Sequence, residues 1–575
     1  MLTTADNLDK RITTLGAAIL IVGLIIITKL FVLQVLEHNF YSTFALSTRE
    51  IYRELYPERG KIFWSDSRTG ETYLAAVNRQ YWQIYAVPNE IDKGDIVSTT
   101  KAITNFLDIT DKDKIIEIQN KLSKAGDPYE PIAKKITADI KDEIQTANLP
   151  GIYATPEDWR YYPENDLGGN ILGFVRPVEQ RRVGNYGVEG FLNETLAGSE
   201  GFIMGERSAL GSLISLAGKT LKPAEAGADV VLTIDRALET EACAALYEGY
   251  KKFETESAAL VMINPKTGAI LAMCSFPSFD PNNYSKVEEA RAFNNTAIFT
   301  AYEPGSVMKP LTVAMAIDQN LISPGTTFTD PCERIINGHK IKNAEGKCYH
   351  TITMTEALEQ SVNLAMIHLE EILGRERFSS YAKKFGLGQK TGISAATEMA
   401  GDISSLDKTG EIYGANASFG QGFTATPLQF AAAYSALANE GRLPKPYLVS
   451  EIRYSDGRVE KTQPEIVEAV ISARTAKLVT GMLVSVAENG HSRGARIPGY
   501  FIAGKTGTAQ IAEKGGYSNE TNHTFAGFGP AGNPKIVVVV KYEKPNVPWA
   551  ESTATVAFKR IMDFAIKYYG LEKER

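Results

Sequence analysis

The sequence has few cysteines, few histidines and no excess of positive charge. Four cysteines in 575 residues cannot form a disulfide scaffold, and six histidines leave little material for a histidine-rich metal site. The 61 basic and 68 acidic residues give a net charge of −7, so nothing points to nucleic acid as a partner. Hydrophobic residues make up 44% and charged residues 22%, which excludes a wholly disordered or fibrous protein.

Long hydrophobic runs are also scarce, and the mean hydropathy of −0.16 excludes a polytopic membrane protein. One run stands out at residues 12–36, where Lys29 is the only charge. As a helix it would span about 37 Å, more than the roughly 30 Å of a bilayer core. It predicts an uncleaved transmembrane anchor. A cleaved signal peptide is the alternative, but apolar residues continue past Lys29 and no Ala-x-Ala site follows.

The charges around this run predict its orientation. Lys10 and Arg11 stand just before it, so the positive-inside rule favours a cytoplasmic tail at residues 1–11. We expect a single-pass protein of the inner (plasma) membrane, with the bulk of the chain outside the cytoplasm.

Two further regions follow the anchor. Residues 37–228 mix short strand-like runs, such as 81–87, with polar stretches of helical spacing, such as 111–147. A small, polar segment at 217–229 is typical of a linker. Beyond it, strands are predicted at 230–234, 258–263, 269–274, 502–503 and 535–542, with helices over 305–440 and 553–569. Strands at both ends of a helical middle predict one α/β-type domain over residues 229–575.

The Ser-x-x-Lys pattern occurs four times, beginning at Ser98, Ser306, Ser380 and Ser405. Only Ser306 follows a Glu-Pro-Gly turn and opens an apolar helix. Lys309 then lies on the same face of that helix as Ser306. The helix dipole and partial burial disfavour an ammonium there, which would let Lys309 accept the serine proton. The alternative is an N-cap serine beside a surface lysine.

Lys-Thr-Gly also occurs four times, and only the copy at Lys505 follows an apolar strand among small residues. Small residues on a strand let a ligand backbone approach closely. Lys505, Thr506 and Thr508 would offer a carboxylate one charge and two hydroxyl donors. Residues 499–506 also fit the phosphate-loop pattern, but the intervening residues are typical of a strand, so nucleotide binding is not favoured.

A Ser-x-Asn pattern occurs once, at Ser361 and Asn363. The surrounding residues 357–372 have helical spacing, and an interruption near Ser361 would present both side chains together. The ordered set of Ser-x-x-Lys, Ser-x-Asn and Lys-Thr-Gly-Thr resembles the penicillin-binding serine acyltransferases, whose motifs occur in this order.

Further segments narrow the resemblance to the class B penicillin-binding proteins, the monofunctional peptidoglycan D,D-transpeptidases of cell division and elongation. These segments are residues 59–62, 160–163, 187–190, 196–198, 232–235, 277–282, 419–422 and 426–429. The resemblance implies an α+β fold with a transmembrane helix, an elongated pedestal (dimerisation) domain at 37–228 and a transpeptidase domain at 229–575. That last domain would have a central antiparallel sheet flanked by helices. The turn at 65–70 departs from the Asp-Arg-Asn-Gly turn that is usual in this family.

The resemblance also implies the mechanism. Ser306 would attack a stem peptide ending in D-Ala-D-Ala, with Lys309 as general base. Ser361 would relay a proton to the leaving D-Ala, and Asn363 would hold Lys309 and the donor amide. The donor carboxylate and peptide would be held by Lys505, Thr506, Gly507 and Thr508, with Gly507 leaving room for the peptide. No metal or organic cofactor is needed, and β-lactams should acylate Ser306.

By resemblance, the partners are peptidoglycan stem peptides, an amine acceptor, a glycosyltransferase of the SEDS type and membrane proteins of the divisome or elongasome. Two alternatives remain for the function. In a β-lactamase or carboxypeptidase water would be the acceptor, and a catalytically silent protein would act as a membrane-anchored scaffold or sensor.

The four cysteines fall into two pairs by context. Cys332 and Cys348 flank a polar stretch with His339 and His350, which leaves open a zinc site. Outside the cytoplasm we favour a disulfide, provided that the two cysteines lie close together. Cys243 and Cys274 stand in apolar patterns and are expected to be plain core residues.

Overall fold

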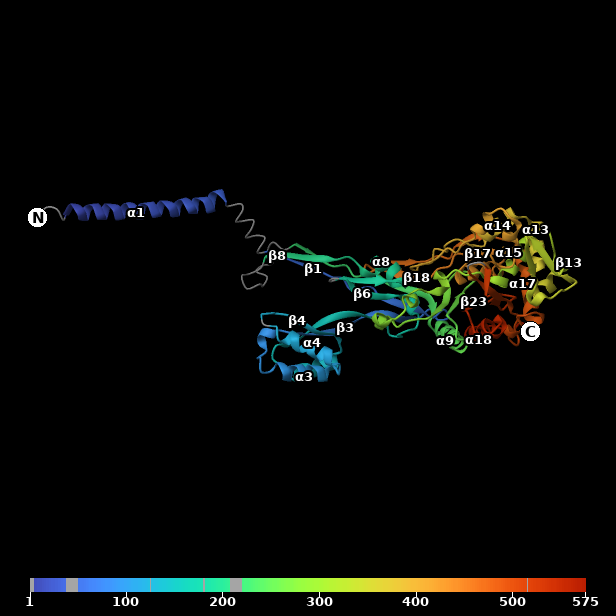
Figure 1. Cartoon of the computed structure of the whole chain (residues 1–575), viewed down its shortest axis with the longest axis horizontal. Coiled ribbons are helices and arrows are strands. Elements are labelled where there is room, and N and C mark those ends of the chain that lie inside the picture. The colour runs from blue at the N-terminus through green and yellow to red at the C-terminus, as the bar shows by residue number, and fades with distance from the viewer. Residues whose placement is uncertain (1–4, 38–49, 125, 179–180, 207–219, 514–515) are drawn as a thin grey trace. The chain divides into compact units, whose positions relative to one another are not determined.

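The computed structural model describes residues 5–37, 50–124, 126–178, 181–206, 220–513 and 516–575. The chain forms two compact units, each built from segments that are distant in the sequence (Figure 1). The first unit holds residues 1–58 and 198–226, and the second holds residues 59–197 and 227–575.

The first unit contains the apolar helix and a small sheet. Helix α1 (Ala5–Phe31) continues into the π-helical turn η1 (Val32–Leu36). Residues 14–36 are long and apolar enough to cross a membrane, in agreement with the predicted anchor. Strands β1 (Glu50–Leu55), β8 (Gly201–Glu206) and β9 (Thr220–Lys222) form an antiparallel sheet in the order β1-β8-β9.

The linker prediction at 217–229 is wrong in part. Residues 220–222 form strand β9, because their backbone pairs with residues 202–204 of β8. Residues 217–219 lie outside the described residues.

In the second unit, the N-terminal segment centres on β3 (Thr72–Ala86), which confirms the strand predicted at 81–87.

The helix predicted over 111–147 is only partly right. Strand β4 (Glu130–Ile136) lies between α4 (Lys112–Leu122) and α5 (Ala138–Thr146). In β4, Ile136 packs inward with Ile84 and Ile144. Strands β3 and β4 and helices α3 and α4 lie together (Figure 1). The other elements here are β2 (Ile62–Ser65), η2 (Pro88–Glu90), α3 (Ile96–Phe106), β5 (Ile152–Tyr161), α6 (Gly169–Leu172), β6 (Phe174–Val178), β7 (Arg181–Asn185), α7 (Gly187–Phe191) and α8 (Asn193–Ala197).

A buried ion cluster holds this segment together. The Glu189 carboxylate is fully buried and accepts hydrogen bonds from Arg59 Nε at 2.7 Å and Arg160 Nε at 2.6 Å. Burial raises the pKa of Glu189, but the charges of Arg160 and Arg59 outweigh it and leave the pKa below its usual value. Removal of either arginine would leave part of this buried charge uncompensated.

The second unit also contains a five-stranded antiparallel sheet in the order β12-β11-β23-β22-β21. It joins β11 (Ser257–Ile263) and β12 (Ile270–Phe276) to β21 (Ala503–Glu513), β22 (Gly516–Gly529) and β23 (Ile536–Glu543). Side chains alternate between its two faces. Leu260 and Val540 pack against α9 (Arg236–Lys252) and α18 (Ala554–Tyr568), whereas Val261 and Val539 belong to the core of α11 (Lys309–Asp318), α16 (Pro427–Ala438) and α17 (Ala473–Asn489). The predicted antiparallel sheet flanked by helices is confirmed.

A second sheet joins β18 (Val449–Arg453) and β19 (Val459–Lys461) to earlier strands, in the order β19-β18-β10-β2-β3-β4, with β5 also pairing with β3. Its strand β10 (Asp229–Asp235) pairs in parallel with β2, so the sheet crosses the predicted domain boundary. The remaining elements are η3 (Pro281–Lys286), η4 (Ala290–Phe293), α10 (Thr296–Phe299), η5 (Gly305–Met308), β13 (Thr327–Thr329), β14 (Glu333–Ile336), β15 (His339–Lys342), η6 (Ala344–Gly346), β16 (Thr351–Thr353), α12 (Met354–Glu359), α13 (Asn363–Leu373), α14 (Arg375–Lys384), η7 (Ser404–Asp407), α15 (Glu411–Ser418), β17 (Arg442–Pro444), β20 (Ile466–Ala469), η8 (Arg493–Ala495) and η9 (Ala550–Ser552).

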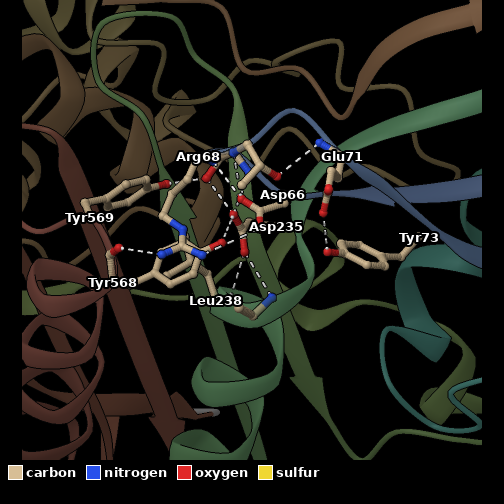
Figure 2. A network of polar contacts seen from close by, with 11 residues as sticks. Asp66, Arg68, Glu71, Tyr73, Asp235, Leu238, Tyr568 and Tyr569 are labelled. Carbon is tan, nitrogen blue, oxygen red and sulfur yellow. Dashed lines mark hydrogen bonds and ion pairs between the residues drawn. The ribbon is translucent and has the colours of Figure 1, made fainter.

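The β2–β3 turn, whose sequence departs from the family, contacts the last helix (Figure 2). The fully buried Asp235 accepts from the Ser67 backbone N–H at 2.8 Å and from the Tyr568 hydroxyl at 3.0 Å. The same carboxylate caps α9 through Leu238 N–H at 3.1 Å. The Arg68 guanidinium lies 4.2 Å from the centre of the Tyr568 ring. Asp235 thus links the turn to the first and last helices of the following region.

We predict that Asp235→Ala lowers the free energy of unfolding by about 2–4 kcal/mol, because it removes a helix cap and leaves the donors of Ser67, Leu238 and Tyr568 without this acceptor. Asp111→Ala is the matched control, since Asp111 caps α4 through a single bond to Asp113 N–H. It should cost only about 1 kcal/mol. Urea unfolding of the full-length protein in detergent compares the two. Equal losses would mean that Asp235 acts only as a cap.

Candidate active site

Ser306 lies on a tight turn, η5, that precedes α11. Gly305 has a φ of +62° and donates its N–H to the Gly420 carbonyl at 2.9 Å. A Cβ at Gly420 would lie only 2.0 Å from the Gly305 carbonyl oxygen, so the two backbones need glycine to approach this closely. The Tyr434 hydroxyl holds the other end of the turn by donating to the Val307 carbonyl at 2.8 Å.

Strand β21 also packs against this turn. A Cβ at Gly507 would lie 2.8 Å from the Pro304 carbonyl oxygen and 3.1 Å from Val307 Cγ1. The absent side chain lets the strand contact the turn that carries Ser306. Ser306 is therefore fixed between two backbone segments from distant parts of the chain. That Gly507 also leaves room for a peptide stays a prediction.

The Ser-x-x-Lys and Ser-x-Asn residues meet at this turn. Ser361 has a φ of +56° and interrupts the helical run between α12 and α13, so the break that would present Ser361 and Asn363 together is present. Its hydroxyl donates to Ser306 Oγ at 3.0 Å. Lys309 Nζ donates to the Ser361 hydroxyl at 3.1 Å and to Asn363 Oδ1 at 2.7 Å. The Ser361 hydroxyl thus bridges Lys309 and Ser306.

Lys309 is fully buried. Burial lowers its pKa well below the usual value of a lysine, and the nearby positive charge of Lys505 lowers the pKa further. A neutral amine is a base, so the local electrostatics suit Lys309 to accepting a proton from a hydroxyl.

The Lys-Thr-Gly-Thr residues lie on β21. Lys505 is also fully buried, which lowers its pKa to about 7. Its Nζ donates to the Thr506 carbonyl at 3.0 Å, and the Thr508 hydroxyl accepts from Ala550 N–H at 3.3 Å. The Thr506 hydroxyl lies 3.4 Å from Lys505 Nζ. A positive charge and two hydroxyls are therefore gathered along one strand beside Ser306.

A groove of about 1410 Å³ opens over these residues. Its walls include Ser306, Asn363 and Thr508, together with Tyr517 and Trp549. Of the other Ser-x-x-Lys serines, Ser98 lies on α3, Ser380 on α14 and Ser405 on η7. Ser405 also lines this groove, but no hydrogen bond links it to Ser306 in the described residues. Residues 504–506 of the phosphate-loop pattern lie within strand β21 and do not open a helix.

The structure pairs all four cysteines. Cys332 and Cys348 form a disulfide that closes the loop bearing β14 and β15. Our expectation that Cys243 and Cys274 are plain core residues is wrong, because α9 packs on β12 and joins them in a second disulfide.

Sequence reasoning missed two features of the site. The roles of Gly420 and Gly507 in backbone contact carry no signal beyond the motifs that contain them. The low pKa of Lys505 follows from its complete burial, which a charged residue in a motif does not reveal.

Comparison with known proteins agrees with this geometry. The protein-family model for the penicillin binding protein transpeptidase domain matches residues 258–563. The family model for the penicillin-binding protein dimerisation domain matches residues 54–232. Stage V sporulation protein D of Bacillus subtilis is 31% identical over 530 residues, which are 91% of this chain and 80% of that protein. Peptidoglycan D,D-transpeptidase FtsI of Escherichia coli is 28% identical over 85% of this chain and 81% of its own.

Solved structures share the fold. Penicillin binding protein 2X from Streptococcus thermophilus superposes with a TM-score of 0.74 at 22% identity, covering 91% of this chain and 83% of that one. The chain belongs to the class B penicillin-binding proteins, with a dimerisation domain followed by a transpeptidase domain.

We predict that Gly507→Ala lowers the free energy of unfolding by about 1–3 kcal/mol, because a methyl group would overlap the Pro304 carbonyl. Gly481→Ala is the matched control. No atom lies within 4 Å of a Cβ there, and alanine in helix α17 should stabilise the protein by about 0.5–1 kcal/mol. Thermal unfolding of both variants tests this. An unchanged melting temperature for Gly507→Ala would contradict the close packing.

Proposed function

We propose that this protein is a peptidoglycan D,D-transpeptidase that crosslinks stem peptides through an acyl-enzyme on Ser306. The observation that carries the proposal is the chain of contacts from buried Lys309 through Ser361 to Ser306. A serine hydroxyl alone is a weak nucleophile, and an adjacent neutral amine gives it a base. The names of the relatives, among them peptidoglycan D,D-transpeptidase FtsI, support the same reaction.

In the first step, Ser306 attacks the carbonyl of the penultimate D-Ala of the donor. Its proton passes through the Ser361 hydroxyl to Lys309. Collapse of the tetrahedral intermediate breaks the peptide bond, and the same route returns the proton to the leaving D-Ala. Asn363 holds Lys309 through its Oδ1 and is proposed to bind the donor amide with its other end.

The donor's terminal carboxylate lies against Lys505, Thr506 and Thr508 in this proposal. Their charge and hydroxyls suit a carboxylate, and a bound anion would raise the pKa of Lys505 and keep it protonated. Backbone N–H groups of Ser306 and Thr508 would stabilise the oxyanion. An amine of a second stem peptide then attacks the acyl-enzyme, which releases Ser306 and forms the crosslink. None of these steps requires a cofactor.

The apolar helix and the two matched domains support a membrane-bound enzyme of the cell wall. We propose a cytoplasmic tail at 1–11, an anchor at 12–36, a pedestal at 37–228 and a transpeptidase domain at 229–575 outside the cytoplasm. Lys10 and Arg11 before the anchor favour this orientation. A SEDS-type glycosyltransferase and divisome or elongasome proteins are the proposed membrane partners. A β-lactamase or a silent scaffold is less favoured than a transpeptidase.

We expect labelled penicillin to acylate the wild-type protein covalently and Ser306→Ala to remain unlabelled while keeping its melting temperature. The acyl-enzyme should persist, since the enzyme uses an amine rather than water as acceptor. Gel fluorescence and intact-protein mass spectrometry measure both properties. Absence of label on the wild type would refute the proposed function, and rapid release of hydrolysed penicillin would favour a β-lactamase.

The pKa values of Lys309 and Lys505 predict how the rate of acylation by penicillin depends on pH. The rate should rise with pH as Lys309 loses its proton, which occurs well below the usual lysine pKa. The rate should fall above about pH 7. Without a bound carboxylate, Lys505 has a pKa of about 7, and only its protonated form binds a carboxylate. Lys505→Arg keeps its charge, so the alkaline fall should disappear. An alkaline fall that persists in this variant would assign it to another group.

A further inference from the structure

Glu303 lies just before the Ser306 turn, and only one of its two carboxylate oxygens accepts a hydrogen bond from the described residues. Its Oε1 accepts from Gly422 N–H at 3.1 Å and lies 3.5 Å from the Tyr517 hydroxyl. Its Oε2 is buried and has no hydrogen-bond partner among the described residues. A buried carboxylate oxygen without a donor costs free energy, and such atoms are rare unless a ligand completes them. Glu303 therefore has the capacity to bind one more donor.

The surroundings of Glu303 connect it to the groove. Gly422 and Tyr517 are both part of the groove wall that contains Ser306. Tyr517 is 37% exposed and lies on β22 opposite Ala512 of β21. Glu303 therefore lies directly behind this part of the groove wall, and the proposed ligand must reach it past Tyr517.

The absence of a basic partner distinguishes Glu303 from the carboxylates that line the groove. Glu345 and Glu520 line the groove, and each is paired with a lysine, at 2.7 Å to Lys347 and 2.9 Å to Lys544. No basic side chain in the described part of the protein pairs with Glu303 in this way. Burial raises the pKa of Glu303, and the hydrogen bond from Gly422 lowers it. A cationic ligand would favour the ionised form.

The proposed direction of the donor places part of the substrate near Glu303. With the terminal carboxylate at Lys505 and the reacting carbonyl at Ser306, the rest of the stem extends along β21 away from Lys505. Gln510 and Tyr517 line the groove in that direction. The residue that precedes the two D-Ala residues therefore lies on the Glu303 side of the turn.

The donor substrate of the proposed reaction carries a cationic group. Crosslinking consumes an amine carried by the acceptor stem, and donor and acceptor are stems of the same polymer. An uncrosslinked donor therefore carries the same free amine, which is an ammonium at neutral pH. We propose that Glu303 binds this ammonium of the donor stem peptide and thereby selects donors whose own amine is still free. The inference rests on the proposed transpeptidase function.

Two peptides test the proposal on the full-length protein in detergent. Nα-acetyl-L-Lys-D-Ala-D-Ala keeps its side-chain amine, and the Nα,Nε-diacetyl form lacks the charge. With glycine as the acceptor, release of D-Ala gives kcat/KM for each donor. We expect the wild type to prefer the free amine by about tenfold, as for one charged hydrogen bond. In Glu303→Gln this ratio should fall to about one.

The ratio within one variant cancels any general loss of activity, and glutamine keeps an oxygen for the Gly422 N–H. Glu345→Gln is the matched control, because it removes another carboxylate of the groove and should leave the ratio at its wild-type value. A preference that survives in Glu303→Gln, or no preference in the wild type, overturns the role of Glu303. Failure of both donors and of penicillin to acylate the wild type overturns the proposed function instead.

Discussion

The site depends on the close approach of three backbone segments around the turn at residues 304–307. Gly420 and Gly507 both contact this turn, and a Cβ at either position would lie within 3.0 Å of its backbone. This packing fixes Ser306 without using its side chain. The nucleophile's hydroxyl is therefore left for Ser361, and the position of Ser306 is set by helices and strands that are distant in the sequence.

Burial of two lysines then determines how readily each one binds a proton. Lys309 and Lys505 are both fully buried, which lowers the pKa of each, and the positive charge of Lys505 lowers the pKa of Lys309 further. Lys309 contacts the Ser361 hydroxyl, which contacts Ser306, so in this interpretation Lys309 is the base, while Lys505 carries the charge that a carboxylate needs. The assignment of roles follows from the difference in environment, since the two side chains are chemically identical.

Much of this arrangement could be predicted from the sequence, because local patterns specify it. The strands at 230–234, 258–263 and 535–542 are apolar runs, and the interruption at Ser361 follows a pattern on an otherwise helical segment. Strand β22 was missed because its first half is polar and has no apolar run. The Cys243–Cys274 disulfide and the unpartnered Oε2 of Glu303 depend on which elements pack together, and a local sequence pattern does not contain that information.

The contacts of the β2–β3 turn have a consequence for synthesis. Ser67 meets Tyr569 across 502 positions of the chain, and β23 lies between β11 and β22 in the central sheet. Ribosomes synthesise the N-terminal segments first, so these segments cannot form their long-range contacts until the C-terminal segments have been made. Long-range pairing of this kind folds slowly, since loop closure precedes any stabilising contact. A chain cut short by a few dozen residues would lose α18 and β23 together, and its nascent sheet would remain an open edge for proteases and aggregation.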